Sequence, residues 1–217
     1  MRLREIIKQS FKQTKSNIKF LAVFFLIVIL VSLTLGFFGS DDIFSLSGFI
    51  SLLLSPVIYY GITKSTLKIA RNEKAQWKGL FIGLNQKTYT SFLAVAILMN
   101  LAFFILALFG GFISMASPLL GSILFLILMV VVMVAFIGVI FFPYYRLIDH
   151  GGDFWSSVKY SFNLAKGKRG FLVKFAIFAF FINIAGALLL GIGLLFTVPL
   201  TSVVIANIYE KLKINNQ

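Results

Sequence analysis

The most chemically reactive stretch of this chain is Asp149-His150-Gly151-Gly152-Asp153, which contains its only histidine. Two carboxylates and one imidazole on a glycine-rich turn are side chains that metal binding or acid–base catalysis would use. Catalytic metal sites usually have three protein ligands and an open position, so this stretch supplies an incomplete set. The pattern is more typical of a polar turn in which Asp153 caps the next helix. We therefore expect no catalytic residue and no metal here.

Cysteine is absent from all 217 residues, which excludes disulfides, thiolate ligands and thiol nucleophiles. A second stretch, Lys166-Gly167-Lys168-Arg169-Gly170, has the glycines and basic residues of a phosphate-binding loop. It lacks the G-x-x-x-x-G-K-[ST] pattern, and no strand is predicted before it. We interpret it as a positively charged anchor beside an apolar segment. The sequence thus predicts neither an enzyme nor a cofactor site.

Polar side chains are sparse in the middle of the long apolar segments, where Asn100 and Asn183 are the mid-span amides. Three of the four prolines also fall in or at the end of these segments, and tyrosine pairs follow two of them: Pro56 with Tyr59 and Tyr60, Pro143 with Tyr144 and Tyr145, and Pro199. Such residues either line a hydrated cavity, where broken helices are tolerated, or hold neighbouring helices together. The segments carry no ionisable group at mid-depth, which argues against coupling to protons through a membrane carboxylate.

The elements that must position these residues follow from the charge distribution. All 20 Lys and Arg residues fall within four clusters, at 2–19, 64–87, 146–174 and 211–213. Each of the three gaps between clusters is long enough for two membrane crossings of about 20 residues. Because basic residues are retained on the cytoplasmic side, we expect both termini there and only Asp41 and Asp42 as external charges.

The composition also indicates a membrane protein, since 12% of the residues are charged against about 25% in a soluble domain. The mean hydropathy is +0.98. We predict an all-α membrane protein with a single polytopic domain over residues 1–217. Its six transmembrane helices are expected at 18–38, 43–63, 90–112, 117–142, 171–190 and 192–209. The external turns are expected at Gly39 to Asp42, near Gly110-Gly111 to Pro118, and near Gly191-Ile192-Gly193.

Each pair of predicted spans follows a segment with an amphipathic pattern. The apolar positions are Leu3, Ile6, Ile7, Phe11 and Ile18 in the first, Trp77, Leu80, Phe81 and Leu84 in the second, and Phe154, Trp155, Val158 and Phe162 in the third. Helices of this kind lie in the membrane interface. The side chains expected to anchor them to lipid head groups are Lys8, Lys12, Lys15, Trp77, Lys78, Trp155, Lys159, Lys166, Lys168 and Arg169.

A unit of interfacial helix, span, turn and span thus occurs three times, at about 1–70, 71–150 and 151–217. Phe20-Leu21-Ala22-Val23 recurs as Phe92-Leu93-Ala94-Val95. This order predicts an internal repeat, which would arrange the spans around a pseudo-threefold axis along the membrane normal.

A family resemblance is visible in the last third of the chain. It rests on Ser157-Val158-Lys159-Tyr160-Ser161-Phe162-Asn163-Leu164 with Gly167, on Gly191-Ile192-Gly193 and Pro199, and on Ile208-Tyr209-Glu210-Lys211-Leu212. These positions resemble six-helix prokaryotic membrane proteins, which include YciC-like inner-membrane proteins and the membrane domain fused to some glycerophosphodiester phosphodiesterases. The resemblance implies a polytopic plasma-membrane protein. It transfers no catalytic residue, because the phosphodiesterase domain is absent from these residues.

Two functions of different classes remain open. The first is a non-enzymatic protein of the prokaryotic plasma (inner) membrane, with a scaffold or membrane-assembly role. The second is a permease for a small solute or an amphiphile, lined by Asn100, Asn183 and the proline and tyrosine positions. The expected partners are anionic lipids, with a membrane protein or a second copy of the chain as a further partner. The net charge of +13 is spread beside apolar segments, which argues against nucleic acid.

Overall fold

The computed structural model describes residues 2–37, 46–116, 119, 121–125, 127–128, 142–189 and 191–214. Within these ranges the regular secondary structure is helical, and turns or irregular backbone connect the helices. The first four helices are α1 (Leu3–Ser16), α2 (Ile18–Phe37), α3 (Leu46–Ala70) and α4 (Gln86–Ala116). The other four are α6 (Pro143–His150), α7 (Phe154–Ala165), α8 (Arg169–Leu188) and α9 (Leu194–Ile214).

Four of these helices, α3, α4, α8 and α9, are long and apolar enough to cross a membrane. A fifth crossing is obtained if α1 and α2, which meet at a bend of 86°, are counted as one span. Helices α2, α3, α4, α8 and α9 overlap five of the segments predicted as spans. Most of the predicted span at 117–142 lies outside the described residues, and the predicted turn at Gly39 to Asp42 lies wholly outside them.

Helices α8 and α9 form the hairpin that was predicted from Gly191-Ile192-Gly193, and these three residues form its turn. Gly191 has a φ of +77°, a left-handed conformation that glycine adopts without strain. Gly186 and Gly193 approach closely, since a Cβ on Gly193 would lie 2.6 Å from the Gly186 carbonyl oxygen. The two helices therefore pack tightly at their turn because these positions lack side chains.

Proline is accommodated inside α3 by a neighbouring hydroxyl. Pro56 has no N–H to donate to the Leu52 carbonyl, and Ser55 Oγ donates to that carbonyl oxygen across 2.8 Å. The helix therefore continues through Pro56. Pro143 instead stands at the first position of α6, where its missing N–H has no cost.

The predicted turn near Gly110-Gly111 is wrong for those two residues, because α4 continues through both of them to Ala116. Glycine is common in apolar membrane helices, and so the pair alone did not mark a helix end. A Cβ on Gly110 would lie 2.3 Å from the Phe125 ring, so a side chain packs closely against this glycine.

Of the three segments predicted as interfacial helices, the first and third are helical and correspond to α1 and α7. The second prediction, based on Trp77, Leu80, Phe81 and Leu84, is wrong, because residues 71–85 form turns and irregular backbone. Gly79 and Gly83 have φ values of +79° and +97°, which interrupt any right-handed helix there. The second predicted unit thus lacks the first element of the proposed repeat.

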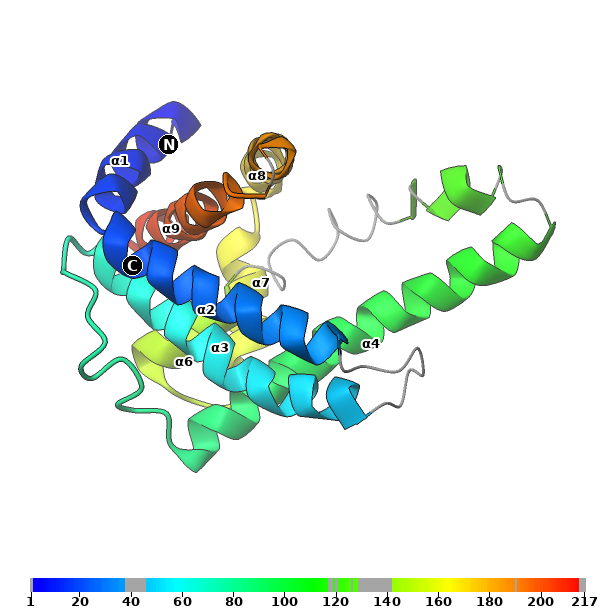
Figure 1. Cartoon of the computed structure of the whole chain (residues 1–217), viewed down its shortest axis with the longest axis horizontal. Helices are drawn as coiled ribbons and strands as arrows, with labels where there is room; N and C mark the ends of the chain where they lie inside the picture. Colours follow the sequence, from blue (N-terminus) through cyan, green and yellow to red (C-terminus); the bar gives the residue numbers. More distant parts are fainter. Residues whose placement is uncertain are drawn as a thin grey trace.

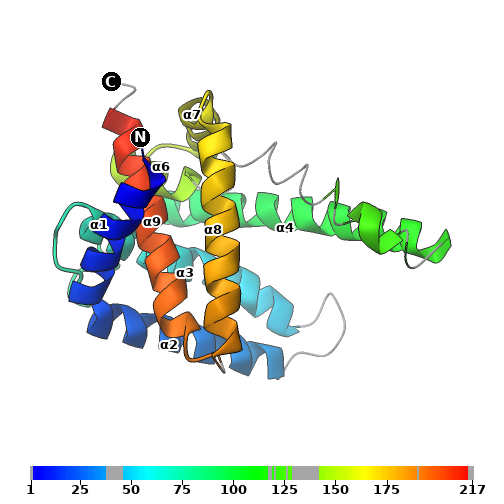
Figure 2. The same cartoon turned by 90° about the horizontal axis from the view of Figure 1, so that it is seen from above.

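The helices splay away from one end of the molecule, where the N- and C-terminal ends lie near each other (Figures 1 and 2). The C-terminal ends of α3, α6 and α9 meet at this end, and α1 packs along α9. Helix α8 runs steeply across α4 in Figure 2, so the described helices do not share one axis. Helix α9 lies at the centre, with Val203, Ala206, Tyr209 and Leu212 fully buried.

Candidate functional site

The end where the helices meet contains a layer of buried polar side chains from α1 and α9, which we call the Asn207 layer. Asn207 Nδ2 donates to Gln13 Oε1 across 2.7 Å and to Ser10 Oγ across 3.0 Å. Gln9 Nε2 donates to Asn207 Oδ1 across 3.2 Å. Gln13 in turn donates to the Ala70 carbonyl of α3 and to Asn72 Oδ1. The layer therefore ties α1, α3 and α9 together through amide side chains.

Beside this layer lies a group of charged residues around Asp149, which we call the Asp149 hub. Arg71 Nη2 lies 2.5 Å from Asp149 Oδ1 and 2.6 Å from Glu210 Oε1. Lys213 Nζ lies 2.5 Å from Asp149 Oδ2, and His150 Nδ1 lies 3.2 Å from the same oxygen. Asp149 is 8% exposed, and its partners come from the ends of α3 and α9. One carboxylate thus joins three helix ends.

The charges of the hub stabilise one another. Burial by itself would raise the pKa of the Asp149 carboxyl, but hydrogen bonds from Lys213 and Arg71 outweigh burial and hold this pKa below its ordinary value of 3.8. Burial would likewise lower the pKa of the Arg71 guanidinium, and its hydrogen bonds to Asp149 and Glu210 raise it. Both groups are therefore charged at neutral pH.

The predicted tyrosine pairs meet in the structure. Tyr59 of α3 stacks on Tyr144 of α6, with ring centroids 5.0 Å apart. Tyr145 stacks on Tyr209 of α9 at 5.4 Å and donates from its hydroxyl to the Ser202 carbonyl. Tyr60 donates to the Ile82 carbonyl across 2.9 Å. Pro56, Pro143 and Pro199 are buried. These positions pack helices against one another, and Tyr59 also borders a groove described below.

The structure separates the two predicted asparagines. Asn100 is exposed on α4 and donates to the Ala96 carbonyl of its own helix across 2.8 Å. Asn183 lies between α8 and α9, where its Nδ2 is 3.5 Å from Thr201 Oγ1. Asn183 Oδ1 is buried without a hydrogen-bond partner. Asn183 thus links α8 and α9, whereas Asn100 bonds to its own helix, α4.

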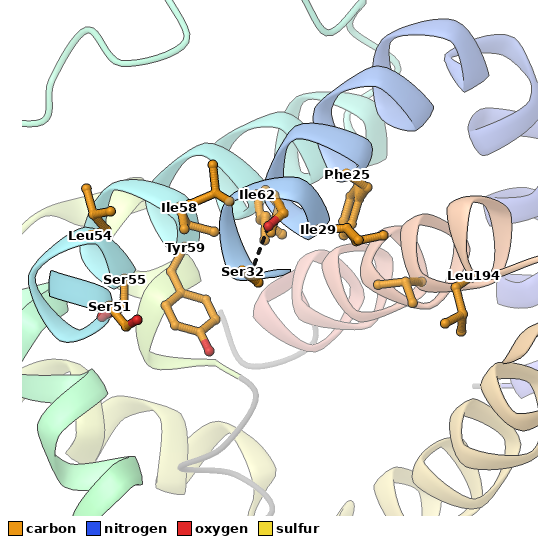
Figure 3. Close-up of a pocket in the computed structure, with 13 residues that line it drawn as sticks. Phe25, Ile29, Ser32, Ser51, Leu54, Ser55, Ile58, Tyr59, Ile62 and Leu194 are labelled. Atoms are coloured by element: carbon orange, nitrogen blue, oxygen red, sulfur yellow. Dashed lines mark hydrogen bonds between the residues drawn. The ribbon is translucent and has the colours of Figure 1, made fainter. Parts of the chain in front are cut away.

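A groove of about 460 Å³ lies between α2, α3 and the start of α9 (Figure 3). Ten of its lining side chains are apolar or aromatic, including Phe25, Ile58 and Leu194, and the others are Ser32, Ser51 and Ser55. Ser32 Oγ donates to the Val28 carbonyl and Ser55 Oγ to the Leu52 carbonyl. Two of the three hydroxyls therefore already donate to a carbonyl of their own helix. The groove suits an apolar or weakly polar ligand.

All the predicted lipid anchors are exposed: Lys8, Lys12 and Lys15 on α1, Trp77 and Lys78 in the 71–85 segment, and Trp155, Lys159, Lys166, Lys168 and Arg169 at α7 and the start of α8. On α1, the buried face contains Ile6, Ser10 and Gln13 and packs on α9, not on the lipid surface that we expected for its apolar face. On α7, Ser157 and Ser161 face inward while Trp155 is 71% exposed.

In the Asp149–Asp153 stretch, both carboxylates are engaged in hydrogen bonds or ion pairs that hold the fold together. Asp153 accepts a hydrogen bond from the Ser156 backbone N–H across 3.2 Å, which confirms the predicted helix cap. Its pKa is lowered by its hydrogen bonds with Ser156. Asp149 is engaged by Arg71 and Lys213, as described above. In the part of the chain that the structure describes, no three His, Asp or Glu side chains come close enough to hold a metal ion.

The Asn207 layer and the Asp149 hub were not predicted as sites. A signal was present for the hub, since the chain has 7 acidic residues against 20 basic ones and Asp149 and Glu210 lie within or beside basic clusters. An isolated acid among bases predicts an ion pair, but its partner cannot be chosen without the fold. For the layer, Ser10 and Gln13 are three positions apart on α1, a helical spacing that places both on one face.

The described chain defines an all-helical protein with four to five helices long and apolar enough to cross a membrane, an arrangement typical of multi-pass membrane proteins. No family model, curated protein or solved structure matches the chain.

Proposed function

We propose that the chain is a multi-pass protein of the prokaryotic plasma (inner) membrane that acts without catalysis, as a scaffold or an accessory in membrane assembly. The observation that carries this proposal is the interlocked end of the molecule. There hydrogen bonds within the Asn207 layer connect α1, α3 and α9, and ion pairs within the Asp149 hub connect the ends of α3, α6 and α9. Groups committed to holding helices together are poorly placed to bind and release a substrate.

The same end supports the proposed orientation. Residues from the segments of all four basic clusters lie there: Gln13 and Asn17 from the first, Arg71 from the second, Asp149 from the third, and Lys213 from the fourth. Because positive charge is retained in the cytoplasm, this end is assigned to the cytoplasmic side. Anionic lipid head groups are the proposed partners of the exposed lysines and Arg169, at about 1 kcal/mol for each basic residue near the surface.

The exposed apolar flank of α4 is the proposed contact for a further partner. Leu101, Phe104, Leu108 and Phe112 are exposed along this helix. Lipid tails, another membrane protein or a second copy of the chain would each bury them. A scaffold uses such a flank to hold a second component in the bilayer.

The alternative, a permease for a small solute or amphiphile, is favoured by the groove between α2, α3 and α9. The groove lies away from the interlocked end and has room for a ligand.

The absence of cysteine permits a direct test. Single Cys residues at Ser51 and Ser55, which line the groove, are exposed to a membrane-impermeant thiol reagent in intact cells and in inverted vesicles. Lys12→Cys, at an exposed position on α1, is the positive control, and Ser10→Cys, at a buried position, is the negative control. Protection of both groove positions supports the scaffold. Labelling of both from the external side, with correct controls, overturns the scaffold in favour of the permease.

A further inference from the structure

Lys64, near the C-terminal end of α3, holds the backbone of a segment that follows in the sequence. Its Nζ donates to the Gly79 carbonyl oxygen across 3.2 Å and to the Ile82 carbonyl oxygen. The Tyr60 hydroxyl, one turn earlier on α3, donates to the same Ile82 carbonyl. An ammonium and a phenol from one helix thus fix two carbonyls of a non-helical segment.

The segment is also fixed by its own glycines and at its start. Gly83 has a φ of +97°, and a Cβ there would lie 2.9 Å from the Tyr60 hydroxyl oxygen. Ala75 N donates to Asn17 Oδ1, and Leu80 is buried. Residues 75–83 are therefore held by hydrogen bonds and packing, even though the predicted helix is absent.

The side chains on the outer side of this segment are apolar. Trp77 is 47% exposed, Phe81 is exposed and Ile82 is 75% exposed. Lys74 and Lys78 flank them and are also exposed. Large exposed apolar groups beside lysines are typical of segments that lie in the membrane interface.

The position of Trp77 identifies the surface that these side chains meet. Its ring contacts Phe20 and Phe24 of α2, with centroids 4.9 and 5.7 Å away. Val23 and Ile27 lie on the same helix and are exposed, so the apolar outer surface of α2 continues into the 77–82 segment. Hydrocarbon that surrounds α2 would therefore border Trp77 as well.

We propose that residues 77–82 form a rigid loop that inserts its apolar side chains into the lipid interface, and that Lys64 is the residue that positions this loop. The inference rests on the membrane location proposed above. The lysines give the loop a preference for anionic head groups, while Trp77, Phe81 and Ile82 enter the boundary between head groups and tails. Lys64 acts through the loop backbone and does not itself contact lipid.

The test uses the tryptophans of the full chain, of which there are only two. Trp155→Phe leaves Trp77 as the sole tryptophan, and the protein is reconstituted in vesicles of phosphatidylcholine and phosphatidylglycerol. Phospholipids brominated close to the glycerol are expected to quench Trp77 fluorescence more strongly than those brominated near the chain ends. Lys64→Met is expected to reduce the shallow quenching by about half and to increase quenching by aqueous iodide, because the loop loses two carbonyl contacts.

Lys68→Met is the matched control, since it removes the same charge one turn further along α3, and among the described residues the loop carbonyls accept from Lys64 and not from Lys68. It should leave the quenching unchanged. If Lys64→Met fails to fold, Gly83→Ala perturbs the loop alone through its φ and the Tyr60 contact. If the protein stays membrane-bound after carbonate washing but bromolipids do not quench Trp77, the loop inference is overturned and the membrane proposal stands. Protein released by the wash contradicts the proposed function itself. Equal quenching in Lys64→Met and its parent overturns the role of Lys64.

Discussion

Arg71 Nη2 lies 2.5 Å from Asp149 Oδ1, and this contact joins residues 78 positions apart in the sequence. The two residues stand at the ends of α3 and α6, and Arg71 also contacts Glu210 of α9. The hub therefore connects the second and third of the predicted sequence units. Its carboxylate is the natural point at which to weaken their association.

Asp149→Asn should destabilise the protein, because Arg71 and Lys213 would lose the charge that they both bond. Asp149 is nearly buried but Arg71 is a third exposed, so we expect a loss of about 1–3 kcal/mol and not the full value of a buried pair. Thermal or SDS unfolding in detergent measures the change. Glu210→Gln serves as the comparison and should cost less, because Glu210 bonds only Arg71 within the hub.

The hub should also make stability depend on pH. The pKa of Asp149 lies below its ordinary value of 3.8, so the stabilisation is fully present above pH 3.8 and is lost as the pH falls through the folded-state pKa. Asp149→Asn should flatten this acid limb and leave the curve above pH 5 shifted by a constant amount. An acid limb that is identical in both proteins would show that another carboxyl is responsible.

Asn207→Ala should remove the centre of the Asn207 layer and leave the amide of Gln13 and the hydroxyl of Ser10 without that partner. Buried polar groups left unpaired cost about 1–3 kcal/mol, and interhelical bonds in membranes average about 0.6 kcal/mol, so a loss near the lower end is expected. A double-mutant cycle with Gln13→Ala should give a favourable coupling energy between the two side chains, so the double variant should lose less stability than the two single variants combined. Asn100→Ala, where the amide bonds only its own helix, should change the unfolding midpoint little.

The α8–α9 hairpin should be sensitive to single methyl groups. Gly186→Ala places a Cβ 2.4 Å from Thr197 Oγ1, and Gly193→Ala places one 2.6 Å from the Gly186 carbonyl oxygen. Overpacking of this kind costs about 1–3 kcal/mol. Gly170→Ala is the control, because nothing lies within 4 Å of its Cβ position and alanine favours a helix. Differential scanning fluorimetry in detergent should show two lowered midpoints and one that is unchanged or raised.

The orientation can be tested at two exposed positions. Cys at Ile192, in the α8–α9 turn, should react with an impermeant thiol reagent in intact cells. Cys at Lys12, in the first basic cluster, should react only after the cytoplasmic side is opened, because basic residues are retained there. Labelling of both positions from one side would contradict the odd number of crossings, five, that the sequence predicts between them.

Local signals in the sequence predicted much of the fold. Long apolar runs bounded by lysines and arginines coincide with α2, α3, α4, α8 and α9, since length and hydropathy are properties of each segment alone. The cap at Asp153 and the turn at Gly191 were also predicted, because each depends on a few adjacent residues. The predicted span at 117–142 is not tested by the described residues.

The contacts between distant segments could not be read from the same signals. Asp149 and Asn207 acquire their partners only when helices from different parts of the chain meet. The spacing of Trp77, Leu80, Phe81 and Leu84 fits a helix, but the backbone at Gly79 and Gly83 and the bonds from Lys64 outweigh it. Tertiary contacts thus overrode a local pattern in the 71–85 segment.

The pairing of α1 with α9 has a consequence for synthesis. Gln13 bonds Asn207, which is translated 194 residues later. Until α9 leaves the ribosome, Ser10 and Gln13 lack their shared partner Asn207, and the face of α1 that packs on α9 stays uncovered. A contact of such long range forms late, so the joining of the two helices would complete folding only after the intervening spans have been inserted.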